Sequence, residues 1–136
     1  MKNRTLILAA LFALIAVIFG AFGAHALKAN LDAAQISAYE IGVRYQYYHA
    51  MALFIVGILG ILATETSFRI SRKFLAFASV CFTLGIILFS GSLYLLSCRE
   101  ILGVTSWTWL GPITPLGGLF LIIGWGCVLL SVLRKN

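Results

Sequence analysis

The chain has 136 residues, of which 62% are hydrophobic and 10% are charged. An ordinary soluble domain carries about 25% charged residues, so this composition excludes that class. The net charge of +6 does not indicate a nucleic-acid partner, because the basic residues lie at the ends of apolar segments and form no binding stripe. We expect a single membrane domain over residues 1-136.

Four apolar segments follow one another along the chain, and none of them contains Asp, Glu, Lys or Arg. They run over about residues 5-25, 45-64, 74-98 and 115-133. A helix needs about 20 apolar residues to cross the hydrocarbon core of a bilayer. The pattern predicts an all-α fold, an integral membrane four-helix bundle.

The first segment carries small residues at steps of three and four, which places them on one helix face. They are Ala9, Ala13, Ala16, Gly20 and Ala24. Small residues let helix backbones approach closely in lipid, so this stripe predicts a helix–helix contact. Residues 24–26 (Ala-His-Ala) also imitate the cleavage site of a secretory signal. The apolar core is longer than a typical signal core, so we interpret the segment as a span.

The polar connection after the first span predicts a short amphipathic helix on the outer membrane surface. Asn30 or Asp32 is a plausible N-cap for it, because a side-chain oxygen can accept from the free backbone donors of a first turn. We expect this helix to run into the second span, with a bend possible near Gly42. A stripe of Ala50, Leu53, Gly57, Gly60 and Thr64, projected backwards, then turns Gln46 and His49 toward the other helices.

The third span carries polar residues at about helical spacing, which we expect to face the bundle. They include Ser79, Thr83, Ser90, Tyr94 and Ser97. The fourth span begins at Thr114-Pro115, and its glycines permit close approach of a neighbouring helix. Those glycines are Gly117, Gly118, Gly124 and Gly126. Trp125 lies near mid-membrane, where its indole N–H requires a partner.

The basic residues set the orientation of the chain. Seven fall on one side of the membrane: Lys2, Arg4, Arg69, Arg72, Lys73, Arg134 and Lys135. Three fall on the other side: Lys28, Arg44 and Arg99. Basic loops stay cytoplasmic, so we predict an N-in/C-in protein with both termini cytoplasmic.

The order of the spans places several polar residues in the outer half of the membrane. This candidate binding cluster consists of His25, Gln46, His49, Ser90, Ser92, Tyr94 and Thr114. Polar groups at this depth are costly unless they are paired, so the cluster is either packing or a site for a ligand or proton.

Other site chemistries have little support in the sequence. Zinc requires three or four strong ligands, and only His25, His49 and Glu40 are candidates, so we expect no metal. The three cysteines have no CxxC spacing. No Ser-His-Asp or Cys-His arrangement is legible, and we expect neither a cofactor nor catalysis.

Five short motifs occur in order along nearly the whole chain. They are GAFGAHAL at 20–27, YQYYHA at 45–50, FSGSLY at 89–94, TPLGG at 114–118 and GW at 124–125. Together they resemble the YgdD-like family of small bacterial inner-membrane proteins, which is related to eukaryotic transmembrane protein 256. The resemblance implies four membrane helices in the bacterial cytoplasmic (inner) membrane, and it implies no catalytic roles.

Three functional hypotheses follow. The first is a non-enzymatic membrane protein that binds a membrane lipid, a partner protein or itself as a homo-oligomer. The second is a small oligomeric transporter or channel that uses the outer-half polar cluster. The third, a lipid-directed enzyme with His25 or His49 as general base, has the least support, because only Tyr94 is available as a partner.

Overall fold

The computed structural model describes residues 2–65 and 70–134, and all regular structure within them is helical. The elements in chain order are α1 (Lys2–Phe22), η1 (Gly23–Leu27), α2 (Ala33–Glu65), α3 (Arg72–Gly85), η2 (Ile86–Ser90), α4 (Gly91–Cys98), η3 (Trp107–Leu110) and α5 (Ile113–Leu133). They form four helices that are long and apolar enough to cross a membrane: Arg4–Leu27, Ala33–Thr64, Arg72–Cys98 and Trp107–Leu133. The all-helical class is therefore confirmed, together with four helices long and apolar enough to span a membrane, of which the second and fourth begin earlier than the sequence predicted.

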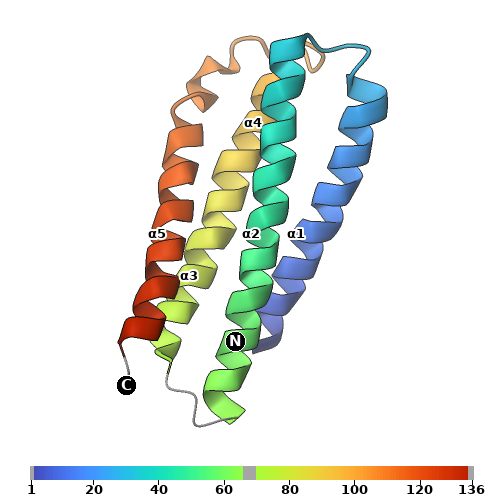
Figure 1. Ribbon diagram of the computed structural model, residues 1–136. Helices are drawn as coiled ribbons and strands as arrows, with labels where there is room; N and C mark the ends of the chain where they lie inside the picture. The colour runs from blue at the N-terminus through green and yellow to red at the C-terminus, as the bar shows by residue number, and fades with distance from the viewer. Residues whose placement is uncertain (1, 66–69, 135–136) are drawn as a thin grey trace.

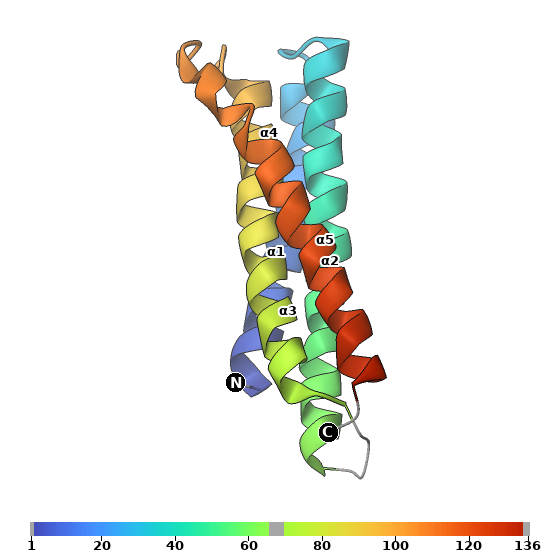
Figure 2. The ribbon, with the colours of Figure 1, turned by 90° about the vertical axis from the view of Figure 1, so that its left-hand side faces the viewer.

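The four spans pack in chain order (Figure 1), with α5 at one side, α1 at the other, and α2 and the third span between them. The most extensive contacts join α1 to α2 and α3 to α5, and α2 joins these pairs through α3, η2 and α4. Figure 2 shows α5 running obliquely across α3 and α4. Both chain ends lie at the same end of the molecule in the two views.

The small-residue stripe of the first span is used inside the chain. Ala9 and Ala16 are buried, and Gly20 lies so close to α2 that a Cβ there would be 3.4 Å from Val43 Cγ1. Thr5 connects the span to α3 through a hydroxyl–hydroxyl hydrogen bond of 3.2 Å to Ser79. The span ends in the π-helical turn η1.

The second span is one continuous helix of 33 residues, about 50 Å long at 1.5 Å per residue. Asp32 precedes it and forms a capping box. The Gln35 N–H donates to Asp32 Oδ1 at 2.8 Å, and the Asp32 N–H donates to Gln35 Oε1 at 2.9 Å. The segment expected as a surface helix thus runs directly into the second span, as expected, and forms the first turns of α2.

Gly42 is buried inside α2, where helical structure continues on both sides of it. A Cβ on Gly42 would lie 2.9 Å from Tyr94 Cε1 and 3.3 Å from Leu93 Cβ. The glycine therefore allows α2 and α4 to approach each other, which is the physical reason for a glycine where a bend was considered.

The third and fourth spans meet through glycines at backbone distance. A Cβ on Gly117 would contact Phe89 N and lie 2.8 Å from Phe89 Cα, and a Cβ on Gly124 would lie 2.6 Å from the Phe82 ring. The Cβ position of Gly126, by contrast, is open. Of the four glycines expected to permit close approach in this span, Gly117 and Gly124 do so most directly.

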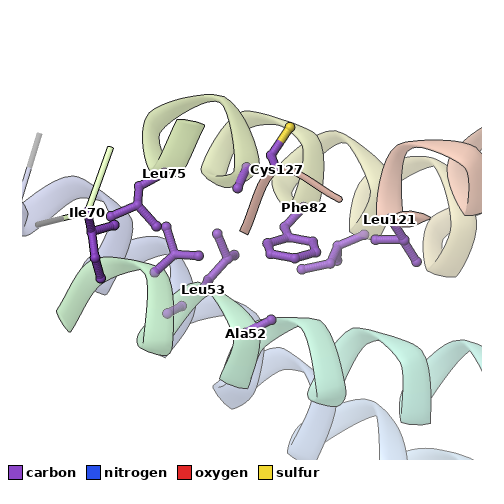
Figure 3. Packing of buried hydrophobic residues seen from close by; sticks show 11 residues of the cluster. Ala52, Leu53, Ile70, Leu75, Phe82, Leu121 and Cys127 are labelled. Atoms are coloured by element: carbon purple, nitrogen blue, oxygen red, sulfur yellow. The ribbon is translucent and has the colours of Figure 1, made fainter. Parts of the chain in front are cut away.

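The hydrophobic core lies between α2, α3 and α5 (Figure 3). Phe82 and Leu53 are fully buried there, and Leu75, Leu121 and Cys127 complete the packing around them. Of α1, Ala9 belongs to this buried cluster and Phe12 packs against it. The first span is therefore the one least integrated into the core.

Candidate functional site

Gln46 joins three of the four spans. Its side chain is 3% exposed, its Nε2 donates to the Phe12 carbonyl of α1 at 2.9 Å, and its Oε1 accepts from the Tyr94 hydroxyl of α4 at 2.9 Å. Side chains on a helix lean toward its N-terminus, and α2 and α4 run in opposite directions, so these two side chains lean toward each other. The bonds satisfy one donor and one acceptor of the amide.

His49 lies one turn further along α2 and connects it to α5. Its Nδ1 lies 2.7 Å from the Tyr45 carbonyl oxygen, which can only accept, so this nitrogen carries the proton. The Nε2 atom is then free to accept from the Trp125 indole N–H at 3.3 Å. The tautomer assigned from these partners is neutral and uses both ring nitrogens. It also supplies the partner that the depth of Trp125 requires.

Ser92, at the start of α4, is hydrogen-bonded to Thr114, at the start of α5. The Ser92 hydroxyl donates to the Phe89 carbonyl at 3.0 Å, within the turn that follows η2. Because a hydroxyl has one proton, the 2.7 Å contact between Ser92 Oγ and Thr114 Oγ1 has Thr114 as its donor. The pair therefore links the first turn of α4 to the first turn of α5.

The remaining two residues of the predicted cluster have no such contacts. Ser90 is 1% exposed, and its hydroxyl has no hydrogen-bond partner in the structure. His25 lies exposed on η1, apart from the buried polar residues. In the structure, therefore, Gln46 is hydrogen-bonded to Tyr94, Ser92 to Thr114, and His49 to Trp125.

Tyr39 is a site residue that the sequence pattern did not single out. It is buried, its hydroxyl donates to the Phe19 carbonyl at 3.0 Å, and its ring lies 5.0 Å from the Tyr94 ring. Phe19 completes the group, with its ring edge-on to Tyr94 at 4.9 Å. The stripe of α2, extended two turns beyond Gln46 through Gly42, leads to Tyr39, so the signal was present in the spacing.

An open groove separates the first span from α4, and we call it the α1–α4 groove. It exists because α1 packs mainly on α2 and leaves α4 uncovered on that side. Its volume is about 390 Å³, and its lining is almost entirely apolar. The lining residues are Phe19, Phe22, Leu27, Tyr39, Gly91, Tyr94, Leu95, Cys98 and Leu102.

The two tyrosines of the groove contribute ring surface and not hydroxyls. Tyr39 directs its hydroxyl to the Phe19 carbonyl, and Tyr94 directs its hydroxyl to Gln46. The groove can therefore bind hydrocarbon but offers few hydrogen bonds. Within residues 2–65 and 70–134, no three His, Cys, Asp or Glu side chains gather as a metal site.

Comparison with known proteins identifies a family and relatives that are named as membrane proteins. Residues 19–118 match the family described as "Protein of unknown function (DUF423)". The UPF0382 membrane protein YwdK of Bacillus subtilis is 40% identical over 129 residues, which is 95% of each chain. The UPF0382 inner membrane protein YgdD of Escherichia coli is 38% identical over 129 residues, 95% of this chain and 88% of that protein.

A UPF0382 membrane protein of Haemophilus influenzae is also 38% identical, over 92% of this chain and 90% of its own. No solved structure matches the chain. The resemblance carried by the five sequence motifs is confirmed by these relatives. The chain belongs to the DUF423 family, whose relatives named here are membrane proteins.

Proposed function

We propose that this protein is a non-catalytic membrane protein that binds a membrane lipid, with one acyl chain held in the α1–α4 groove. The groove itself is the observation that supports the proposal. Its volume of about 390 Å³ falls in the range of small-molecule sites, about 300–1,000 Å³. Between two membrane spans, the molecules that surround such an apolar groove are lipids.

Contacts within the chain favour a lipid over a second copy or a partner protein. Three of the span glycines are already used inside the chain: Gly57 packs against Leu6, Gly124 against Phe82 and Gly117 against Phe89. Gly91, by contrast, lines the groove and has open space where a Cβ would be. A flexible acyl chain fits an irregular apolar groove without hydrogen bonds.

We propose further that both termini are cytoplasmic, in the bacterial inner membrane. Both chain ends lie at one end of the molecule (Figure 1), where α1 and α3 begin and α5 ends. Arg4, Arg72 and Arg134 belong to this end, while Arg69 and Lys135 lie outside the described residues. The excess of basic residues supports a cytoplasmic end. In this proposed orientation the groove lies in the outer leaflet.

The first turns of α2 extend toward the same outer surface in this arrangement. A helix of about 50 Å exceeds the hydrocarbon core of about 30 Å by several turns. We propose that Ala33–Arg44 passes through the outer headgroup region as a continuation of the span. Asp32, Gln35 and Glu40 supply the polar character that this depth requires.

The alternative, a small oligomeric transporter or channel, has weaker support. A transport site requires polar groups that can exchange partners with a substrate. Gln46 and His49 instead use their polar atoms on Phe12, Tyr94, Tyr45 and Trp125. These bonds favour the interpretation of the polar residues as links between spans.

Native mass spectrometry of the protein released from phospholipid nanodiscs tests the proposal. Gly91→Leu fills the groove, whereas Gly126→Leu adds the same side chain at an open position outside it. We expect the wild-type protein and Gly126→Leu to retain lipid and Gly91→Leu to lose it, with all three folded by circular dichroism. Equal retention by the two variants would overturn the groove as the binding site.

A further inference from the structure

We propose that the groove selects an anionic phospholipid, whose phosphate is held by Lys28 and Arg99. This inference rests on the lipid-binding function proposed above and names the class of lipid. It is carried by the position of two basic residues, each of which directly follows a residue that lines the groove, and by the absence of carboxylate partners for them in the described structure.

The two basic residues follow lining residues at one end of the groove. Leu27 and Cys98 both line it, and Lys28 and Arg99 are the residues that immediately follow them. Leu27 and Cys98 also belong to one apolar cluster, together with Tyr39. The ends of η1 and α4 are therefore side by side, and each continues into a basic residue.

Neither cation is neutralised by a neighbouring acid in the structure. Among residues 2–65 and 70–134, the side chains of Lys28 and Arg99 form no ion pair or hydrogen bond. Glu100 is exposed and unpaired, and the Asp32 carboxylate accepts from the Gln35 N–H. Both cations cap the negative ends of helices, but this role uses no side-chain hydrogen-bond donors. Their donors remain available to a phosphate.

The length of the groove agrees with a lipid seated from the headgroup downward. From Gly91 to Cys98 it extends about 10 Å along α4, at 1.5 Å per residue. One leaflet of hydrocarbon is about 15 Å deep, half of the roughly 30 Å core. The groove can hold the part of one acyl chain nearest the headgroup, which brings the phosphate to the end where Lys28 and Arg99 lie.

The net charge of the headgroup then determines which class of lipid the two cations favour. A phosphatidylglycerol headgroup carries one negative charge and pairs with the two cations. A phosphatidylcholine headgroup carries a quaternary ammonium as well, which the same cations repel. Each basic residue near an anionic lipid surface favours binding by about fivefold. We expect a preference for the anionic lipid of at least this size.

The test uses nanodiscs that contain equal amounts of phosphatidylglycerol and phosphatidylcholine with identical acyl chains. The lipid retained by the full-length protein is identified by native mass spectrometry. We expect at least fivefold enrichment of phosphatidylglycerol on the wild-type protein. The double variant Lys28→Gln, Arg99→Gln should lose the enrichment and still retain lipid.

Arg44→Gln is the matched control, because Arg44 is a cation of the same half of the molecule that lines a different pocket and is not next to any lining residue of this groove in the chain. Equal amounts of the two lipids on the wild-type protein, or an Arg44→Gln effect as large as that of the double variant, would overturn the headgroup assignment. In that case the groove proposal stands if Gly91→Leu still removes bound lipid. If Gly91→Leu retains lipid, the groove proposal itself fails.

Discussion

The two halves of the molecule are held together differently. The third and fourth spans touch at backbone distance where Gly117 meets the backbone of Phe89, and Gly124 leaves room for the Phe82 ring. The first and second spans also use small residues, Ala9 and Ala16, but α1 covers little besides α2. The interface between the third and fourth spans borders the hydrophobic core. The interface between the first and second spans leaves the α1–α4 groove open beside it.

This difference shows that small residues alone do not predict how completely an interface closes. A glycine opposite a backbone fixes the distance between two helices, because nothing at the contact can move aside. A small residue opposite a flexible side chain fixes it less strictly. Substitutions at the two interfaces can therefore separate rigid contact from adaptable contact.

Gly117→Ala should have the largest effect. Its new methyl group would meet the backbone of Phe89, which cannot rotate away, so α5 and η2 must separate. We expect destabilisation of about 3 kcal/mol, the upper part of the usual range for overpacking. Equilibrium unfolding in detergent measures it, with Gly126→Ala as the control at an open position. Equal stability of the two variants would contradict the rigid contact.

The link between Gln46 and Tyr94 should come next. Gln46→Leu leaves the Tyr94 hydroxyl without its acceptor, and Tyr94→Phe leaves Gln46 Oε1 without its donor. We expect each to cost about 1–2 kcal/mol, the usual penalty for an unpaired buried group. The double variant should cost less than the sum of the two. Strict additivity would show that the pair does not interact, and Tyr48→Phe, at an exposed tyrosine, is the control.

Gly57→Ala tests the adaptable interface directly. The added methyl group would lie 2.6 Å from Leu6 Cδ2, which is the end of a flexible side chain. We expect a loss of less than about 1 kcal/mol, since repacking of Leu6 offsets most of the strain. Unfolding under the conditions used for Gly117→Ala gives the comparison. A loss as large as that of Gly117→Ala would remove the distinction between the two interfaces.

Ser90→Ala should have the smallest effect and the opposite sign. The Ser90 hydroxyl is buried without a partner, so its removal relieves an uncompensated desolvation cost. We expect unchanged stability or a gain of up to about 1 kcal/mol. Ser92→Ala, which removes a hydroxyl bonded to Phe89 and Thr114, should instead destabilise. Equal losses in the two variants would show that Ser90 has a partner.

The four long apolar helices could be predicted from the sequence, because the hydrocarbon core requires a certain length and an apolar composition of every helix that crosses it. It also identified Gln46 and His49 as facing other helices, since helical spacing determines the face. The sequence predicted that Trp125 requires a hydrogen-bond partner, but it did not predict that this partner is His49. That identity depends on the rotation of α5 against α2, which no local pattern encodes.

The α1–α4 groove could not be predicted from the sequence for a similar reason. Its existence depends on α1 packing mainly against α2. The small-residue stripe predicts close contact but does not identify the partner helix. His25 was grouped with the polar residues because it ends the first span at the correct height. The depth of a residue in the membrane does not determine which way its side chain points, and on η1 the His25 side chain is exposed.

The packing of spans in chain order has a consequence for biogenesis. The main partner of the second span is the first, and the main partner of the fourth is the third. A chain that enters the membrane one hairpin at a time therefore finds each of these partners in the hairpin that has just been inserted. Assembly then needs only one later step, the docking of two preformed hairpins through α2, and no span has to wait for a distant part of the chain to be synthesised.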